Sequence, residues 1–507
     1  MFVAHTYEDW LAAPEDKRDL LKKIIGEYKA SHDFTHALIA QQYFASENPE
    51  IKNKYIVKLD SYESEVAAID PATGKPLLDP ETGKPITEKR LVKNEKKVAG
   101  TRLSSGFFFR FVTQQNQHLL ANGVTLKDAK AKKMLGRAFD TTLSRMGEHA
   151  LVDGVAWGFW NKDHLEEIRA AVDGRSGAVA LVSEEDSTPR VLIQFWQLSD
   201  KKPQFVRVFT LEGVTMYRSD DDGQLQEHMP MQPYLITRLK DRAGVIGATA
   251  SGYGVLPVVP LYANPEKRSE LTESIKSKID CFDRIFSGFG DNFDMADDVY
   301  WVLNNFGGNS KDILEMLHQI HELRVVANRS DGTGGASTAE PHTFEVPYAA
   351  RQTALDILKR ELYRDYMATD TEALTGGSLT NVAIRAATKD MNLKDDRYEW
   401  EVFAFVQGVL RLNGIETEEI SFVRQPFENE TETIENIYRA AEDLDRETRL
   451  RKNPMVSQDE IPRIMKNKAA EEATGIASLK QLQDEINKAN NPAPDDEEDE
   501  DDGTGPR

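Results

Sequence analysis

Residues 264–292 read NPEKRSELTESIKSKIDCFDRIFSGFGDN, and apolar residues recur along this stretch at spacings of three and four. Asn264 suits an N-cap and Pro265 the first helical position, so the sequence predicts a helix over 265–292. A single apolar stripe predicts a single buried side of this helix. The stripe that the spacing defines contains Leu271, Ile275, Ile279, Phe282 and Phe286.

A small α/β module is expected next, over residues 293–346. Strands are predicted over 298–303, 323–327 and 343–346, with a helix over 311–321. A second amphipathic helix is predicted over 347–368, and its apolar stripe contains Leu355, Leu358 and Leu362. Because each helix of this pair has one apolar side, we expect lateral packing of several copies around a shared axis to cover these sides.

The segment TDTEALTGGSLTN (369–381) interrupts the helical pattern, because its two glycines give the backbone freedom that a helix lacks. From residue 382 the chain is expected to be helical as far as 413, with Gly414 ending the helix. The second half of this long helix, from Trp400 onwards, is apolar on more than one face, so we expect it to be buried.

The remaining parts predict an α+β protein. Residues 1–264 contain candidate strands at 191–196 and 204–211. The motif DPATGKP (70–76) recurs as DPETGKP (79–85), which predicts two polar turns in a hairpin-like excursion. A returning strand is expected over 420–427 and charged helices over 428–490, whereas the acidic residues 491–507 have the composition of a disordered tail.

This order of parts resembles the portal proteins of tailed bacteriophages, especially the long-tailed type that infects Gram-positive hosts. No single motif decides the match, which rests on their shared order. The stretches that carry it are SSGFFFRFVTQQNQHLLANGVT (104–125), GVLPVVPLYANPEKRSELTESIKSKIDCFDRI (254–285), YWVLNNFGGNSKD (300–312), TGGSLTNVAI (375–384) and the acidic tail.

The resemblance implies a ring of twelve subunits at one vertex of the capsid, with double-stranded DNA passing non-specifically along its axis. It implies contacts with the terminase large subunit, a head-completion or adaptor protein, and the major capsid and scaffolding proteins. The protein would be made in the bacterial host cytoplasm and reside in the virion. In family terms, the parts are the wing (1–264 and 382–427, with a long kinked helix), stem helices (265–292 and 347–368), clip (293–346), tunnel loop (369–381), α-helical crown (428–490) and acidic tail (491–507).

The same resemblance places the short polar or acidic residues of the loop 369–381 toward DNA. A plain interhelical turn is the alternative reading of residues 375–378. Arg385 and Lys389, one helical turn apart, are candidates for rings of positive charge that contact phosphates, with an ordinary solvated helix face as the alternative. The candidate DNA-facing residues are Asp370, Glu372, Thr375, Gly376, Gly377, Ser378, Thr380 and Asn381.

Composition limits the possible functions. The net charge is −22 and the pI is near 5.0, so the chain shows no basic face for gripping phosphates. An acidic channel wall would let a duplex slide, although the same acidity is common in cytosolic proteins. Cys281 is the only cysteine, which excludes an intrachain disulfide. No stretch is apolar for long enough to span a membrane, and residues 1–15 lack the pattern of a signal peptide.

We find no catalytic, cofactor-binding or metal-binding signature, so an enzyme is not expected. His318, His321 and Glu322 form HxxHE, which lacks the HExxH order of zinc proteases and fits a polar helix face better. Two alternatives to the ring remain: a non-viral oligomeric interaction scaffold that merely uses long helices, and an enzyme with an unrecognised site.

Overall fold

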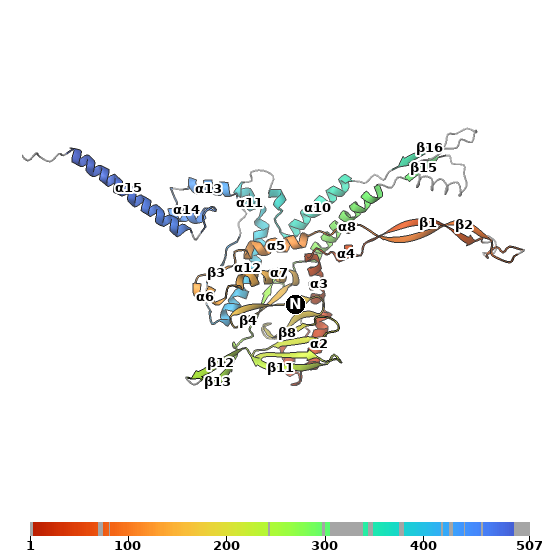
Figure 1. Ribbon diagram of the computed structural model, residues 1–507, viewed down its shortest axis with the longest axis horizontal. Coiled ribbons are helices and arrows are strands. Elements are labelled where there is room, and N and C mark those ends of the chain that lie inside the picture. The colour runs from red at the N-terminus through yellow and green to blue at the C-terminus, as the bar shows by residue number, and fades with distance from the viewer. Residues whose placement is uncertain are drawn as a thin grey trace, which may run out of the picture. The chain divides into compact units, whose positions relative to one another are not determined.

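The computed structural model describes residues 4–68, 75–80, 82–241, 244–296, 300–304, 338–342, 348–374, 380–416, 419–424, 429–440, 442–457 and 460–490. The chain divides into two compact units. The main unit comprises Met1–Asp370 and Lys389–Pro426, and the C-terminal unit comprises Thr371–Thr388 and Phe427–Arg507. Helices and sheets are both present, as the sequence predicts for an α+β protein (Figure 1).

An antiparallel six-stranded sheet forms one layer of the main unit, in the order β11-β10-β9-β8-β7-β6. Along β8, Val191 and Ile193 face one apolar cluster, whereas Leu192 faces another, which is the two-residue alternation of a strand covered on both faces. The strands span Ala171–Val172 (β6), Ser176–Val182 (β7), Pro189–Trp196 (β8), Phe205–Phe209 (β9), Gly213–Ser219 (β10) and Leu225–Pro233 (β11).

Each face of this sheet has its own cover. Residues of α1 (Tyr7–Ala12), α2 (Arg18–Lys29) and α3 (His32–Phe44) join the cluster on one face. A three-stranded sheet, β14-β4-β5, contributes to the cluster on the other face. Its strands are β4 (Val155–Asn161), β5 (His164–Arg169) and β14 (Val258–Tyr262), and the hairpin β12 (Leu235–Asp241) and β13 (Gly244–Ser251) precedes β14.

The largest apolar cluster lies among the helices α3, α5, α7 and α12 and the strands β4 and β14. Phe405 of α12 comes so close to Gly158 of β4 that a Cβ there would lie 2.7 Å from its ring. α12 therefore sits directly on the three-stranded sheet. The bounds of the elements not yet given are α4 (Pro49–Lys52), α5 (Phe107–Leu120), β3 (Val124–Leu126), α6 (Ala129–Met134), α7 (Phe139–Asp153), α12 (Lys389–Leu412) and β17 (Ile420–Phe422). Strand β17 pairs with β3.

Helix α8 spans Glu273–Ala296, so the expected start at Pro265 is wrong. Asn264 caps a closed turn instead, since its Oδ1 accepts from the Arg268 N–H at 3.2 Å. Thr272 then takes the capping role for α8 by accepting from the N–H of Ile275 at 3.4 Å. The partner helix α10 spans Tyr348–Tyr366 and packs beside α8 in the main unit (Figure 1).

Two long strands surround the repeated DPxTGKP motifs. β1 (Tyr55–Ala67) and β2 (Thr87–Ala99) pair antiparallel over 13 residues each, so the expected excursion is a long hairpin. Beyond α8, β15 (Tyr300–Asn304) pairs with β16 (Thr338–His342). The helix expected over 311–321 and the strands expected over 323–327 and 343–346 lie outside the described residues.

The long helix expected from residue 382 is interrupted at Thr388. It consists of α11 (Asn381–Ala387) and α12, which belong to different units, so the expected kink is a break in the helix. Gly414 ends α12 as predicted: its φ is 74°, and the Gly414 and Ile415 N–H groups donate to Arg411 O and Leu410 O. Trp400 is 71% exposed, contrary to the expectation that the second half of the helix is buried throughout.

Helices make up the described secondary structure of the C-terminal unit. They are η1 (Thr371–Leu374), α11, α13 (Glu430–Arg439), α14 (Arg446–Lys452) and α15 (Ile461–Asn490). Asp445 is the N-cap of α14, and its carboxylate accepts from the Thr448 N–H at 3.1 Å.

Candidate functional site

The candidate DNA-facing loop is described only at its two ends. Thr375, Gly376, Gly377 and Ser378 lie outside the described residues, so their expected role stays a prediction. Glu372 is exposed in η1, and Asp370 forms an ion pair with Lys359 of α10 at 3.7 Å. These two acidic residues lie on opposite sides of the boundary between the two units.

The N-terminal end of the loop is fixed to α5. The Gln114 amide donates to Thr369 O at 3.0 Å and accepts from Thr369 N–H at 3.2 Å. One turn earlier in α10, the Tyr366 hydroxyl donates to Gln115 Oε1 at 2.8 Å. Thr369 is buried, so this reciprocal amide pair replaces water on both of its backbone groups.

The C-terminal end of the loop is fixed to α13, within the C-terminal unit. Thr380 caps α11 by accepting from the Ala383 N–H at 3.3 Å. The Asn381 N–H donates to the carboxylate of Glu432 at 2.6 Å, and the Asn381 side chain accepts from the Asn429 N–H at 2.7 Å. The polar groups of Asn381, an expected DNA-facing residue, are therefore engaged with α13.

Arg385 and Lys389 do not share one continuous helix. The break at Thr388 falls between them, and they belong to different units. Both side chains are exposed, which fits the solvated-face alternative as well as phosphate contact. Their expected role as neighbouring rings of charge therefore stays a prediction.

The apolar stripes of α8 and α10 are covered unequally. The expectation that they find cover mainly from other copies is wrong for the part nearest the core, where four residues are buried within the chain: Leu271, Ile275, Ile279 and Leu362. Phe282, Leu355 and Leu358 are half-buried, and Phe286 is 39% exposed. Burial of the apolar side chains thus decreases along the helix pair away from the core, and the outer part of the pair leaves apolar surface exposed.

A second buried side of α8 was missed by the sequence analysis, which expected only one. Asp280, Asp283, Ser287 and Asp291 are all buried on it. The N–H groups of Ser105, Leu103 and Thr101 donate to Asp283 (2.9 Å), Ser287 (3.0 Å) and Asp291 (2.6 Å). Their spacing of three and four along the helix was a visible signal of this second stripe.

These three hydrogen bonds form a ladder between α8 and the segment 101–105. The two segments stay in register because two residues of extended chain and one turn of helix cover similar distances, about 6 Å. Burial raises the pKa of Asp283, although Asn48 and Ser105 donate to its carboxylate. Lys54, directly before β1, forms an ion pair with Asp291 at 2.5 Å. The ladder therefore holds both ends of the β1–β2 hairpin against α8.

Charged side chains with little exposure link the first half of α12 to its neighbours. Lys394 lies 2.7 Å from Glu270 and donates to Tyr366 O at 3.0 Å, so α12 is tied to the segment before α8 and to the last residue of α10. Burial lowers the pKa of Lys394, against the opposing effect of Glu270. Asp395 pairs with His118 of α5 at 2.5 Å, and burial raises the pKa of this carboxyl.

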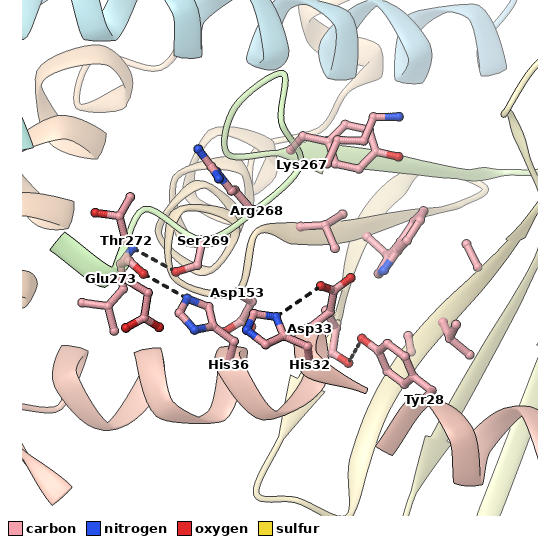
Figure 2. Close-up of a pocket in the computed structure, with 18 residues that line it drawn as sticks. Tyr28, His32, Asp33, His36, Asp153, Lys267, Arg268, Ser269, Thr272 and Glu273 are labelled. Atoms are coloured by element: carbon pink, nitrogen blue, oxygen red, sulfur yellow. Dashed lines mark hydrogen bonds and ion pairs between the residues drawn. The ribbon is translucent and has the colours of Figure 1, made fainter. Parts of the chain in front are cut away.

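A cavity of about 300 Å³ lies in the main unit, between α2, α3, the sheets and the segment that leads into α8 (Figure 2). His36 bonds Leu271 O at 2.9 Å, and burial lowers the pKa of its ring. The indole N–H of Trp157 is buried there without a hydrogen-bond partner. Both signs of charge line the walls, including His32, Asp33, Lys267, Arg268 and Glu273, so the cavity does not select one ligand charge.

Among the described residues, no group of three or more His, Cys, Asp or Glu side chains is arranged to hold a metal ion. His318, His321 and Glu322 lie outside those residues. Within the described part of the chain, no helix has the length and apolar character that a bilayer-spanning segment requires.

Comparison with known proteins adds an independent finding. A family model described as "Phage portal protein, SPP1 Gp6-like" matches residues 41–491. The portal protein of Clostridium phage phiCD119 is 24% identical over 206 residues, which is 38% of this chain and 45% of that protein. The portal protein of Bacillus phage SPP1 is 27% identical over 237 residues, which is 43% of this chain and 45% of that protein. The chain therefore spans less than half the length of each of these curated relatives.

Proposed function

The chain belongs to the family of SPP1 Gp6-like phage portal proteins, and from this premise we propose that it forms a ring that conducts double-stranded DNA. The ring contains twelve subunits at a unique capsid vertex. DNA passes through it during packaging and again during ejection.

The observation that carries the proposal is the placement of the loop 369–381. It leaves the paired helices α8 and α10 at an end fixed to α5, and it joins α11 at an end fixed to α13. Each end of the loop is thus anchored by hydrogen bonds within its own unit. In a ring, the loop is repeated in every subunit and surrounds the axis.

We assign the other parts of the chain to the stem, clip, wing and crown of the ring. The paired helices form the stem, β15 and β16 belong to the clip, the main unit supplies the wing, and α13–α15 supply the crown. The exposed outer part of the stem, around Phe286, supports lateral contact between copies. The clip is the surface for the terminase large subunit and later for a head-completion or adaptor protein, while major capsid and scaffolding proteins surround the ring.

The charge of the chain supports a conduit over a DNA clamp. With a net charge of −22, the subunit as a whole repels phosphates, which favours a duplex that slides over one that is held. The expected DNA-facing residues between Asp370 and Thr380 are short, and short polar groups suit transient contacts through water. Movement of the DNA is driven by another protein, the terminase.

The proposal is tested by lengthening the loop. Insertion of six Gly and Ser residues between Gly376 and Gly377 should leave ring assembly intact and reduce DNA packaging into capsids. The matched control is the same insertion after Gly223, whose φ of 73° places it in an open turn between β10 and β11. Equal packaging by both insertion variants would contradict a conducting role for the loop and favour an interaction scaffold.

A further inference from the structure

The two ends of the loop 369–381 are held by different units. Gln114 holds Thr369 within the main unit, and α13 holds Asn381 within the C-terminal unit. The division of the chain follows the same pattern, because α11 groups with residues 427–507 and not with α12. The backbone after the loop therefore takes its position from the C-terminal helices.

The contact between α11 and α13 is an exchange of helix caps. Residues Asn429 and Glu432 have the N-cap and N3 positions of a capping box, in which the N3 carboxylate normally accepts from the N-cap N–H of its own helix. Here Glu432 accepts from the Asn381 N–H at 2.6 Å, and Asn381 accepts from the Asn429 N–H at 2.7 Å. Each helix thus satisfies an unpaired N–H at the start of the other.

Two further features strengthen this crossed cap. The Asn381 amide also donates to Thr433 Oγ1 at 3.0 Å, so both polar ends of its side chain are bound. The Glu432 carboxylate lies at the N-terminus of α11 and in the first turn of α13, and a negative charge is favourable at both places. Glu432 is half-buried, which limits screening of these interactions by salt.

Apolar packing contributes little to the position of α11. The helix has seven residues, none of them buried, and an isolated helix of this length is unstable in water. Although α11 continues through Thr388 into α12, the contacts described between its first residue and α13 are the polar ones of Asn381. Loss of these contacts should release α11 while α13 remains folded, because α13 keeps its own cap from Asn429 to the Glu432 N–H.

We propose that the crossed cap between Asn381 and Glu432 positions the C-terminal end of the DNA-facing loop, at Thr380 and Asn381, and that DNA passage depends on this anchor. This inference rests on the proposed function. Asn381 is then a positioning residue that acts through Glu432, and its effect on DNA passage does not come from contact with DNA.

Hydrogen exchange on the full-length ring tests the physical part of the proposal. Asn381→Ala and Glu432→Ala should each accelerate amide exchange over residues 381–387 by roughly five- to ten-fold, the effect of losing one cap. Glu432→Gln keeps an acceptor and should restore much of the protection. Glu430→Ala is the matched control, since Glu430 is an exposed acidic residue in the same turn of α13. Unchanged exchange in both alanine variants, or equal acceleration in Glu430→Ala, would overturn the proposal.

A double-mutant cycle tests the functional part. DNA packaging is measured for Asn381→Ala, Glu432→Ala and the double variant, with ring assembly checked for each by electron microscopy. If Asn381 acts through Glu432, the double variant packages as much DNA as either single variant. If Asn381 contacts DNA directly, the two losses multiply and the proposal fails. Loss of packaging after loop insertion, together with normal packaging by both alanine variants, would reject this inference while leaving the conduit intact.

Discussion

Helices α12 and α15 are both long, yet they differ in what covers them. α12 buries residues on several faces, among them Val402, Phe405 and Val406. α15 buries Ile461 at its start, whereas Ile476, Leu479, Leu482 and Ile486 are all exposed along its later turns. An aliphatic stripe at this spacing is typical of a helix that packs against a partner. The position of α12 is thus determined by its own chain, whereas the stripe of α15 is left uncovered by the described residues.

The charges of the two helices follow the same division. Lys394 of α12 and its partner Glu270 have side chains that are only 14% and 13% exposed, and removing one member would leave the other without a counter-charge. Lys468 and Glu471 of α15 lie 3.4 Å apart with largely exposed side chains, where solvent screens their attraction. Buried contacts fix α12 in place, whereas the surface pair on α15 contributes little to stability.

The largest effect is expected for Phe405→Ala in α12. Its ring is fully buried against Gly158, so truncation leaves a cavity and should lower the free energy of unfolding by roughly 3–5 kcal/mol. Urea denaturation of the purified chain measures this change. A loss below about 1 kcal/mol would mean that α12 is less tightly packed than its burial indicates.

Lys394→Ala should have the next largest effect, a loss of roughly 2 kcal/mol, because the Glu270 carboxylate, which is only 13% exposed, loses its counter-charge and keeps the Asn264 amide as a donor. The matched control is Arg397→Ala, one turn along the same helix. Arg397 pairs with Glu266 at 2.8 Å, but both side chains are exposed, so its loss should be below about 1 kcal/mol. Equal losses in the two variants, measured by the same denaturation, would contradict the role given to burial.

A smaller effect is expected where α10 meets α8. The Asp365 carboxylate accepts from Lys278 and Ser274, and these hydrogen bonds lower its pKa below the ordinary value of 3.8. A depressed pKa stabilises the fold above that value, and the contribution disappears as the pH falls through the folded-state pKa. Asp365→Asn should therefore cost about 1 kcal/mol at pH 7 and less below pH 3.8.

Unfolding measured at both pH values checks this prediction. A difference between the parent chain and Asp365→Asn that stays constant with pH would show that the carboxylate charge is irrelevant. Glu361→Gln is a suitable control, because its pair with Arg364 spans 3.8 Å within α10 and makes no tie to α8.

The smallest effect on the single chain is expected for Leu479→Ser in α15. Because this side chain is exposed, the free energy of unfolding should change by less than about 0.5 kcal/mol. Ring formation should nevertheless weaken, since the stripe loses an apolar contact between copies. Sedimentation velocity at several concentrations measures assembly, and unchanged assembly would exclude the stripe as a subunit contact.

The sequence predicted the parts of the fold that depend on local signals. Apolar periodicity located α8 and α10, and Gly414 correctly marked the end of α12. The sequence-based prediction placed the start of α8 too early. Asn264 and Thr272 are both good caps, and only the folded chain shows which one begins the helix. The sequence did not indicate that the long helix breaks at Thr388, because no proline or glycine lies there.

Long-range polar contacts could not be predicted. Gln114 and Thr369 are separated by 255 residues, and nothing in either local sequence indicates their reciprocal bonds. Asn381 was expected to face DNA because of its place in the loop, whereas its partners lie about fifty residues further along the chain. Spacing along one element defines a face of that element, but only the fold determines what the face contacts.

The proposed function requires copies of this chain to form a closed ring with the loop 369–381 nearest the axis. Electron cryo-microscopy of the purified full-length protein tests it most directly. We expect closed rings of twelve copies with a central channel wide enough for duplex DNA and with residues 369–381 at its wall. A chain that stays monomeric at high concentration, or a ring with this loop on its outer rim, would contradict it.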